Sequence, residues 1–361
     1  MTEGRPPILL VEDTASLSHV YRGVLEKAGY SVDCAFLAEE ARGKHAGSSR
    51  RLVLLDLMLP DGDGLDLLRE MRSADPDGEV IVITANGSIN KAVDAMRGGA
   101  FDFLVKPFDD RRLLSAVSNA MAGLEAGAPA AADGAHFHGF IGSSAPMRRV
   151  YDMIRDIGRS TATVFITGES GTGKEVAAQA IHAASLRASG PFIPLNCAAI
   201  PASLLESEVF GHLKGSFTGA ISDKVGAAAA ADGGTLFLDE ICEMDLSLQT
   251  KLLRFLQTST VTPVGAVAPR KVDTRIVCAT NRDPVAEVKA GRFREDLFYR
   301  LHVVPIHLPP LRDRDEDVVA VAEALLRRFA ADEGKTFQRL APEVANLFRA
   351  FPWPGNVRQL Q

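Results

Sequence analysis

The sequence predicts an α/β protein that begins with a small doubly wound domain, continues with a larger α/β domain and ends in a small helical subdomain. Two observations predict the sheets: short apolar runs alternate with amphipathic helical stretches, and a glycine-rich loop stands between such a run and a helix. A third concerns the last part of the chain, where strand-like runs stop at Asp315 while helical spacing continues.

Composition limits the class of protein. The chain has 361 residues, 46% of them hydrophobic and 24% charged, which fits two or three globular domains without extensive disorder. Its formal net charge of −6, without a dense run of Lys and Arg, argues against nucleic-acid binding by these residues alone. No apolar run approaches the roughly 18 residues of a membrane helix, and four scattered cysteines indicate reduced thiols. We expect a soluble, cytoplasmic protein without membrane contact.

The first domain takes its predicted strands from four apolar runs, at residues 8–11, 52–55, 80–83 and 103–105. Near-continuous apolar runs are typical of parallel strands that helices cover on both faces, as in the flavodoxin-like arrangement. A helix is expected after Asp109, which can cap it, and an Ala/Gly/Pro stretch follows that helix. We therefore place the first domain at residues 1–124 and a linker at residues 125–138.

Polar side chains follow these strands: Glu12 and Asp13, then Asp56, Thr84 and Lys106. Because the carboxyl ends of parallel strands line one crevice, we expect these groups to converge. Carboxylates at this density attract Mg2+, which bridges a phosphoryl donor and an attacking carboxylate, while a lysine and a hydroxyl hold the transferred oxygens. Asp56 is the predicted nucleophile. The plain alternative, acidic residues that merely end strands, leaves Lys106 and Thr84 unexplained.

The second α/β domain is predicted over residues 139–311. Its expected strands are residues 164–167, 192–195, 235–238, 275–279 and 303–308. Beyond them, apolar residues keep helical spacing as far as Phe329, and Pro342 opens another helix. We place a small helical lid at residues 312–361, where the sequence stops in mid-pattern.

Residues 168–175 read Gly-Glu-Ser-Gly-Thr-Gly-Lys-Glu and lie between a predicted strand and a predicted helix. In that context backbone N–H groups and the helix N-terminus cradle polyphosphate, so the loop predicts ATP binding. Lys174 would neutralise the β and γ phosphates, whereas Glu175 stands where the general motif has a hydroxyl for Mg2+. The candidate ATP contacts are Gly168, Glu169, Ser170, Gly171, Thr172, Gly173, Lys174 and Glu175.

A second motif supplies groups for hydrolysis. Residues 236–240 read Leu-Phe-Leu-Asp-Glu, a buried strand that ends in Asp239, to hold Mg2+, and Glu240, to polarise the attacking water. Arg294 and Arg300 are candidates for a cation that a neighbouring subunit supplies to the transferring phosphate. A surface salt-bridge cluster is the alternative interpretation of these arginines.

Between these two motifs, residues 215–220 read Gly-Ser-Phe-Thr-Gly-Ala. The terminal glycines allow tight turns, which places an apolar ring and a hydroxyl at the tip of a projecting loop. Such a tip suits contact with another protein, whereas an ordinary surface turn would not explain an aromatic ring held in water. The candidate contact residues are Gly215, Ser216, Phe217, Thr218, Gly219 and Ala220.

The first domain resembles the receiver domain of two-component response regulators. The resemblance lies in residues 55–60, Leu-Asp-Leu-Met-Leu-Pro, and in residues 105–108, Val-Lys-Pro-Phe. It implies a histidine kinase or a histidine phosphotransfer protein as phosphoryl donor. Many members have a tyrosine where this chain has Phe103, which lacks the hydroxyl. The implied roles are phosphoacceptor for Asp56, magnesium ligands for Glu12, Asp13 and Asp56, and switch residues for Thr84, Phe103 and Lys106.

The rest of the chain resembles the sigma-54 activators of the NtrC class, in residues 168–175, 215–220 and 353–358, the last reading Trp-Pro-Gly-Asn-Val-Arg. In that class Glu175 is normal. Members are AAA+ ATPases that assemble, usually as hexamers, and use ATP hydrolysis to remodel the closed complex of sigma-54 RNA polymerase into an open one. The implied roles are phosphate binding for Lys174, metal and water for Asp239 and Glu240, restraint of Glu240 for Asn196, sensing for Asn281 and Arg358, trans fingers for Arg294 and Arg300, and sigma-54 contact for Phe217 and Thr218.

Within the class, residues 10–17, 239–255 and 277–284 are most similar to a quorum-sensing branch, whose members receive phosphate through a histidine phosphotransfer protein. The sequence departs from the class at Ser216, where alanine is usual, and at residues 227–231, an alanine run in place of bulkier residues. We expect retained but altered coupling to sigma-54. DNA binding is expected only through a C-terminal helix-turn-helix that this sequence lacks.

Two rival interpretations remain. One is a phosphorylation-switched module that binds ATP without productive turnover, which Asp239, Glu240 and the two arginines argue against. The other is an AAA+ motor for another client, such as an unfoldase. The loop at residues 215–220 argues against that client, because it pairs an aromatic residue with a threonine instead of lining a pore with basic residues.

Overall fold

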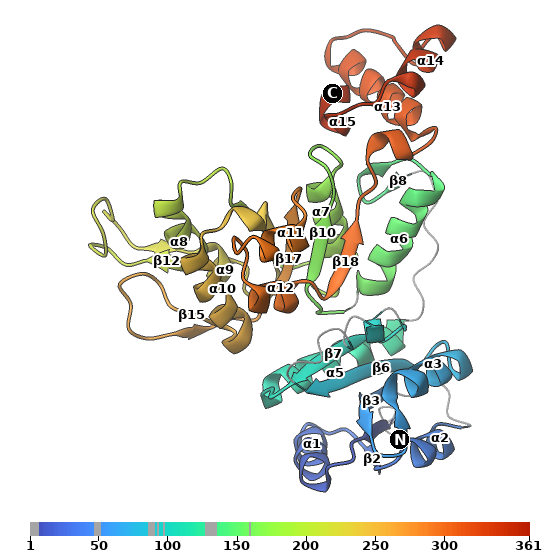
Figure 1. The fold of residues 1–361 in the computed structure, drawn as a ribbon, viewed down its shortest axis with the longest axis vertical. Helices are drawn as coiled ribbons and strands as arrows, with labels where there is room; N and C mark the ends of the chain where they lie inside the picture. Colours follow the sequence, from blue (N-terminus) through green and yellow to red (C-terminus); the bar gives the residue numbers. More distant parts are fainter. Residues whose placement is uncertain are drawn as a thin grey trace. The chain divides into compact units, whose positions relative to one another are not determined.

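The computed structural model describes residues 7–46, 52–85, 91, 94–96, 98–126, 136–158 and 160–361. The chain forms two compact units, Met1–Ala131 with Arg159–Ala162, and Ala132–Gly158 with Thr163–Gln361 (Figure 1). Most of the predicted linker, at residues 127–135, lies outside the described residues. Within the described part of the chain, none of the helices combines the length and the apolar character needed to cross a membrane.

The first unit is built on a five-stranded parallel sheet in the order β2-β1-β3-β6-β7. The predicted α/β class and the four predicted strands are confirmed. The sequence analysis missed β2, whose short run is interrupted by the exposed Asp33. The strands are β1 (Ile8–Val11), β2 (Val32–Ala35), β3 (Leu52–Asp56), β6 (Glu79–Ala85) and β7 (Asp102–Lys106), and a small hairpin joins β4 (Met58–Leu59) to β5 (Gly62–Asp63).

Helices cover both faces of this sheet because alternate residues of its buried strands belong to different cores. In β1, Ile8 and Leu10 pack in one core with α1 (Ala15–Lys27) and α5 (Asp110–Ala126). Leu9 and Val11 pack in the other core with α2 (Ala38–His45) and α3 (Gly64–Ala74). With both faces covered, the carboxyl ends of the strands are left to form the site.

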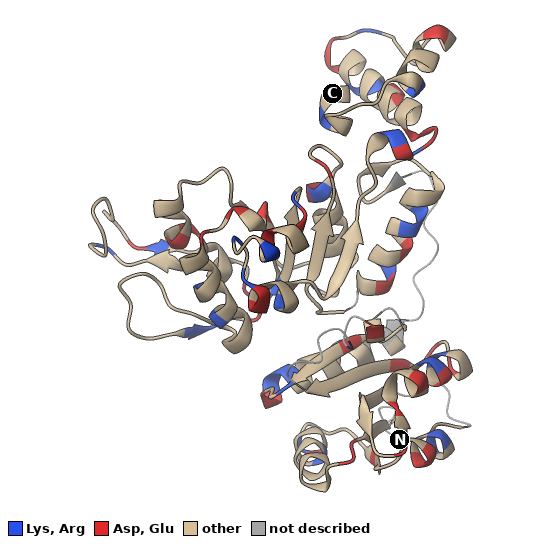
Figure 2. Ribbon diagram, in the orientation of Figure 1, with Lys and Arg blue, Asp and Glu red and all other residues tan. Residues whose placement is uncertain are grey.

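The second unit contains another five-stranded parallel sheet, in the order β11-β14-β17-β10-β18. Its strands carry few charged residues, which gather on the helices and loops (Figure 2). The strands lie within two residues of the predicted ranges. They are β10 (Val164–Thr167), β11 (Phe192–Asn196), β14 (Thr235–Asp239), β17 (Arg275–Thr280) and β18 (Val304–His307).

Helices and three small hairpins surround this sheet. The helices are α6 (Ala145–Gly158), α7 (Lys174–Ala183), α8 (Ala202–Phe210), α9 (Ala227–Ala230), α10 (Leu246–Thr258), α11 (Pro284–Lys289) and α12 (Glu295–Leu301). The hairpins pair β8 (His136–Phe137) with β9 (Phe140–Ile141), β12 (Gly211–His212) with β13 (Lys224–Val225), and β15 (Thr260–Val261) with β16 (Arg270–Lys271).

The helical subdomain follows β18, as the spacing predicted. It consists of α13 (Asp317–Asp332), α14 (Pro342–Ala350) and α15 (Asn356–Leu360). Leu311, Val318 and Trp353 form its small core, and the Trp353 indole donates to the carbonyl of Phe348. This core positions the start of α15 for the contacts described below.

Candidate functional site

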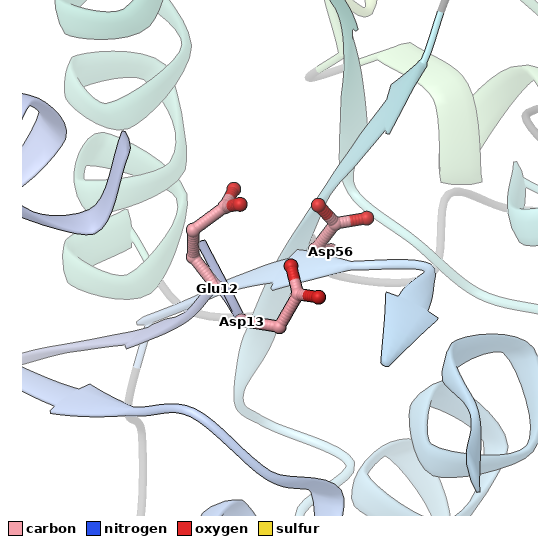
Figure 3. Close-up of side chains that lie close together, drawn as sticks. All are labelled: Glu12, Asp13 and Asp56. Carbon is pink, nitrogen blue, oxygen red and sulfur yellow. The ribbon is translucent and has the colours of Figure 1, made fainter. Parts of the chain in front are cut away.

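Three carboxylates converge at the carboxyl edge of the first sheet. Glu12 and Asp13 follow β1, and Asp56 ends the neighbouring β3 (Figure 3). One oxygen from each of the three lies within 4.8 Å of the others, with Glu12 and Asp56 buried and Asp13 exposed. Hard oxygen ligands of this kind fit Mg2+, which keeps several waters, and the exposed Asp13 leaves room for them.

Lys106, at the end of β7, lies against two of these carboxylates. Its Nζ is 2.6 Å from Asp56 Oδ2 and 2.7 Å from Glu12 Oε2. Burial raises the pKa of Glu12, and the hydrogen bond from Lys106 offsets this only in part. Burial also acts to lower the pKa of Lys106, but its bonds to Asp56 and Glu12 outweigh burial and raise that pKa overall.

Thr84 occupies the strand between Asp56 and Lys106, since β6 lies between β3 and β7 in the sheet. The Thr84 hydroxyl is buried and has no hydrogen-bond partner among the described residues. Such an orphaned donor is free to bind an oxygen that enters the pocket. Phe103, on β7, is half-buried against the core formed with α2 and α3.

In the second unit, the glycine-rich loop joins β10 to α7 as predicted. Gly171 and Gly173 adopt φ of 80° and 100°, which lets the chain curl back before the helix starts. Lys174, the first helical residue, is buried, and its Nζ donates to the carbonyls of Gly168 and Glu169 at 3.1 and 3.4 Å. The loop and helix N-terminus thus form the cradle expected for phosphates.

The second motif lies at the end of β14 and meets this cradle across β17, which stands between β14 and β10 in the sheet. Lys174 Nζ lies 3.7 Å from Glu240 Oε1, although the two residues are distant along the chain. Glu240 has φ of 51° and accepts a hydrogen bond from the backbone N–H of Asn281 at 3.0 Å. Burial, reinforced by the neighbouring charge of Glu240, raises the pKa of Asp239.

Asn196 makes a different contact from the one the resemblance implied. Its Nδ2 donates to Asp239 Oδ2 at 3.4 Å instead of to Glu240. The sheet explains this, because Asn196 on β11 is the register partner of Asp239 on β14. The left-handed turn at Glu240 directs the carboxylate of Glu240 toward the end of β17 instead.

The two candidate finger arginines make local contacts in the single chain. Arg294 binds Asp296 at 2.7 and 3.0 Å and Thr250 Oγ1 at 3.3 Å, while Arg300 donates to the carbonyl of Leu256 at 3.2 Å. Arg292 forms a salt bridge with Glu287 at 2.7 Å. Within one chain, therefore, the arginines hold positions on the surface around α12.

The loop at residues 215–220 lies between β12 and β13. The backbone N–H of Gly215 donates to the carbonyl of Ala220 at 2.8 Å, which closes the loop. The expectation that Phe217 stands in water is wrong: its ring is half-buried and meets that of His212 edge-on, 5.0 Å between centroids. Ile221, just beyond the loop, is the exposed apolar side chain, at 84%. Thr218 is exposed, as expected.

Comparison with known proteins assigns each part of the chain. Residues 8–118 match the response regulator receiver domain, residues 140–307 the sigma-54 interaction domain and residues 312–361 the AAA+ ATPase lid domain. The chain is a sigma-54 activator response regulator of the LuxO/NtrC class. It is therefore an AAA+ ATPase that binds ATP. Its receiver implies a phosphoryl-donating kinase, and its sigma-54 interaction domain implies interaction with RNA polymerase.

The relatives agree with this assignment. The regulatory protein LuxO of Vibrio parahaemolyticus is 53% identical over 357 residues, covering 98% of this chain and 78% of that protein. The response regulator PilR of Pseudomonas aeruginosa is 44% identical over 357 residues, covering 99% of this chain and 80% of PilR. A crystal structure of NtrX from Brucella abortus in complex with ATP is 35% identical, with a TM-score of 0.58, over 99% of this chain and 78% of that one.

The lid of this activator reaches the phosphate loop. Arg358, the candidate second sensor, donates to Ser170 Oγ at 2.9 Å. The carboxylate of Glu169, a candidate ATP contact, instead binds two lid residues, Arg312 and Asn356. The hydrogen bond from Arg312, which has the larger effect, and the one from Asn356 lower the pKa of Glu169 to about 2.

The sequence analysis missed Arg312 and Asn356. Asn356 was quoted only as part of the 353–358 motif, and Arg312 carries no motif of its own. One signal pointed toward Asn356: an Asn directly after a Gly, at the start of a helix, suits a left-handed turn, and the residue has φ of 51°.

Lys106→Met should destabilise the receiver in a pH-dependent manner. Removing the cation leaves Glu12 and Asp56 facing each other in a buried pocket, at a cost of about 3 kcal/mol. The pKa of Glu12, already raised by burial, should rise further. A carboxyl whose pKa is raised on folding favours the folded state at low pH, and this contribution is lost as pH rises through the folded pKa. Calorimetry should therefore show that the receiver of this variant loses more stability, relative to the parent, at pH 8 than at pH 4.5, the ordinary pKa of a glutamate.

The matched control is Arg22→Met, which removes an exposed ion pair with Glu26 at 2.7 Å and should lower the stability of the receiver far less than Lys106→Met does. Added Mg2+ should restore part of the stability that Lys106→Met loses. Equal losses of stability for the two variants, or a loss for Lys106→Met that is smaller at pH 8 than at pH 4.5, would contradict the described charge balance.

Proposed function

We propose that phosphorylation of Asp56 controls an oligomeric AAA+ ATPase that remodels sigma-54 RNA polymerase for open-complex formation. The observation that carries this proposal is the meeting of Lys174 with Glu240 at 3.7 Å beside Asp239, which joins two separate motifs in one ATPase site. The family assignment supports the client. The boundaries 1–124, 125–138, 139–311 and 312–361 remain our division of the chain into receiver, linker, ATPase subdomain and lid.

In the receiver, the Asp56 carboxylate attacks the phosphorus of a phosphohistidine on a kinase or histidine phosphotransfer protein. An O–P bond to Asp56 forms as the P–N bond to the donor breaks, and the histidine ring, protonated on its other nitrogen, takes the electron pair of that bond and leaves neutral. Bound Mg2+, held by Glu12, Asp13 and Asp56, would neutralise the phosphoryl oxygens. Lys106 and the Thr84 hydroxyl, which has no partner in the part of the chain that the structure describes, bind two of those oxygens. Movement of Thr84 is then passed on to Phe103.

In the ATPase domain, Glu240 orients a water that attacks the γ-phosphorus, and the P–O bond to ADP breaks. Lys174 neutralises the charge of the β and γ phosphates, and Asp239 would hold the Mg2+ that accompanies ATP. Asn196 fixes Asp239, while Asn281 and Arg358 sense the nucleotide. The remaining contacts with the phosphates of ATP come from the backbone of the phosphate loop.

Assembly completes this site. Arg294 and Arg300 exchange their local partners for the γ-phosphate that a neighbouring subunit binds, so hydrolysis requires an assembly of subunits. We propose a homo-oligomer, from a dimer to a hexamer. The loop at residues 215–220 then presents Thr218 and the released Phe217 ring to sigma-54. The similarity to LuxO supports a quorum-sensing type of input. A cytoplasmic location follows from the proposed client, since sigma-54 RNA polymerase acts in the cytoplasm.

Thr218→Ala should preserve ATP hydrolysis but abolish open-complex formation. Thr218 is exposed and lies on the loop between β12 and β13, outside the two motifs that form the ATPase site, so ATP hydrolysis should stay within about twofold of the parent rate. Open-complex formation on a sigma-54 promoter should be lost, because the contacting hydroxyl is gone. The matched control is Thr336→Ala, an exposed threonine of the lid, and Lys174→Ala should abolish both activities. A Thr218→Ala variant that opens promoters normally would remove the loop from the client contact.

Ser216→Ala should stabilise the ATPase domain. The Ser216 hydroxyl oxygen is buried and lacks a hydrogen-bond partner within the described part of the chain, and burying such a group costs about 1 kcal/mol. The alanine should recover about that amount in the melting of this domain. Ser247→Ala, which removes an exposed hydroxyl bonded to Asp245, should change stability by less than about 0.5 kcal/mol. A destabilised Ser216→Ala variant would show that the hydroxyl has a partner.

A further inference from the structure

Lid residues bind the outer side of the phosphate loop, the side away from the phosphates. Asn356 is fully buried, and its Nδ2 donates to the carbonyl of Ser170 at 3.0 Å and to Glu169 Oε2 at 3.1 Å. Its Oδ1 accepts the backbone N–H of Leu311 at 2.7 Å. A single buried amide therefore ties the loop to both ends of the lid sequence.

Two further lid donors continue this contact. The backbone N–H of Val357 donates to the carbonyl of Gly171 at 3.0 Å, and the buried Arg314 donates to the carbonyl of Thr172 at 2.6 Å. A side chain at Gly171 would not fit, since its Cβ would lie 2.3 Å from the carbonyl oxygen of Gly355. We call Arg312, Arg314, Asn356 and Val357 the lid clamp.

Three consecutive carbonyls of the loop, at residues 170, 171 and 172, thus accept lid donors. A trans peptide is planar, with its N–H and C=O pointing in opposite directions. The N–H groups of the same peptides therefore point to the opposite side, where a phosphate loop binds its ligand. That of Thr172 donates within the loop, to the carbonyl of Glu169 at 3.3 Å. Those of Gly171 and Gly173 would face the phosphates from the edge opposite the lid.

Glu169 is the loop side chain through which the lid clamp acts. Both of its oxygens bind Arg312, at 2.6 and 3.0 Å, and one also binds Asn356. Exposed ion pairs usually contribute little, and these two side chains are each 43% exposed. This pair differs in being bidentate and in sharing its carboxylate with a fully buried amide, which fixes its geometry.

We propose that Glu169 is a positioning residue that couples nucleotide binding to docking of the lid. Its carboxylate holds Arg312 and Asn356 so that the lid clamp fixes the loop peptides with their N–H groups toward the phosphates. Nucleotide binding and lid docking then strengthen each other, because coupling between two binding equilibria is reciprocal. This role rests on nucleotide binding by the phosphate loop and differs from that of Arg358, whose contact is with Ser170.

The test compares ADP binding by the full chain, measured by titration calorimetry with Mg2+, for Glu169→Gln, Arg312→Gln and the double variant. Each single substitution should weaken ADP binding about tenfold, within the usual range of coupling between sites. The double variant should be no weaker than either single one, because both remove the same contact. Additive losses would overturn the proposal, as would parent-like affinity in Glu169→Gln.

Glu316→Gln is the matched control. Glu316 forms a bidentate pair with Arg349 at 2.7 to 3.1 Å, but both residues belong to the lid and neither contacts the loop. This variant should bind ADP like the parent. Lys174→Ala tests nucleotide binding itself: if it bound ADP as the parent does, the proposed ATPase site would fail, whatever the Glu169 variants did.

Hydrogen exchange of the lid separates positioning from a general loss of structure. Saturating ADP should slow amide exchange across residues 312–361 in the parent and in Glu316→Gln, and this protection should be lost in Glu169→Gln at equal saturation. Equal protection in all three would overturn the proposal. If Glu169→Gln does not fold, Arg312→Lys keeps the charge and loses the bidentate geometry, and it should show a smaller loss of affinity in the same direction.

Discussion

Parallel strands end along one edge of a sheet, and both sites of this protein depend on that constraint. In the receiver, the ends of four strands bring Glu12, Asp56, Thr84 and Lys106 together from across 94 residues of sequence. In the ATPase domain, the ends of β10, β14 and β17 bring the phosphate loop to Asp239, Glu240 and Asn281. The helices secure this edge by covering the faces, which leaves the strand ends accessible to phosphoryl groups.

In each of the two sites, one lysine balances the negative charge of the groups around it. Lys106 divides its hydrogen bonds between two buried carboxylates, and Lys174 lies between loop carbonyls and Glu240. In each case a phosphoryl group can take over bonds that the lysine already makes within the protein. The cation is therefore oriented before its ligand arrives, which reduces the reorganisation that binding and catalysis require.

Sequence predicted most of the fold and of both sites because their signals are local. The loop at 168–175, the strand that ends in Asp239 and Glu240, and the acidic strand ends could each be interpreted from a few neighbouring residues. The strand β2 was missed because Asp33 interrupts a short apolar run. The contact of Asn196 with Asp239 depends on sheet register, and the burial of Phe217 depends on His212 folding over it. Contacts between Glu169 and the lid join residues more than 140 positions apart, beyond any local pattern.

The central claim is that hydrolysis requires a neighbouring subunit, because the candidate finger arginines of a single chain bind local groups. The most direct test is the rate of ATP hydrolysis per chain, measured over a wide range of protein concentration, for the parent and for Arg294→Ala. The account predicts a steep rise in specific activity with concentration for the parent, and none for the variant even where it assembles. A parent rate per chain that is constant from dilute to concentrated protein would contradict it, since a site complete in one chain needs no partner.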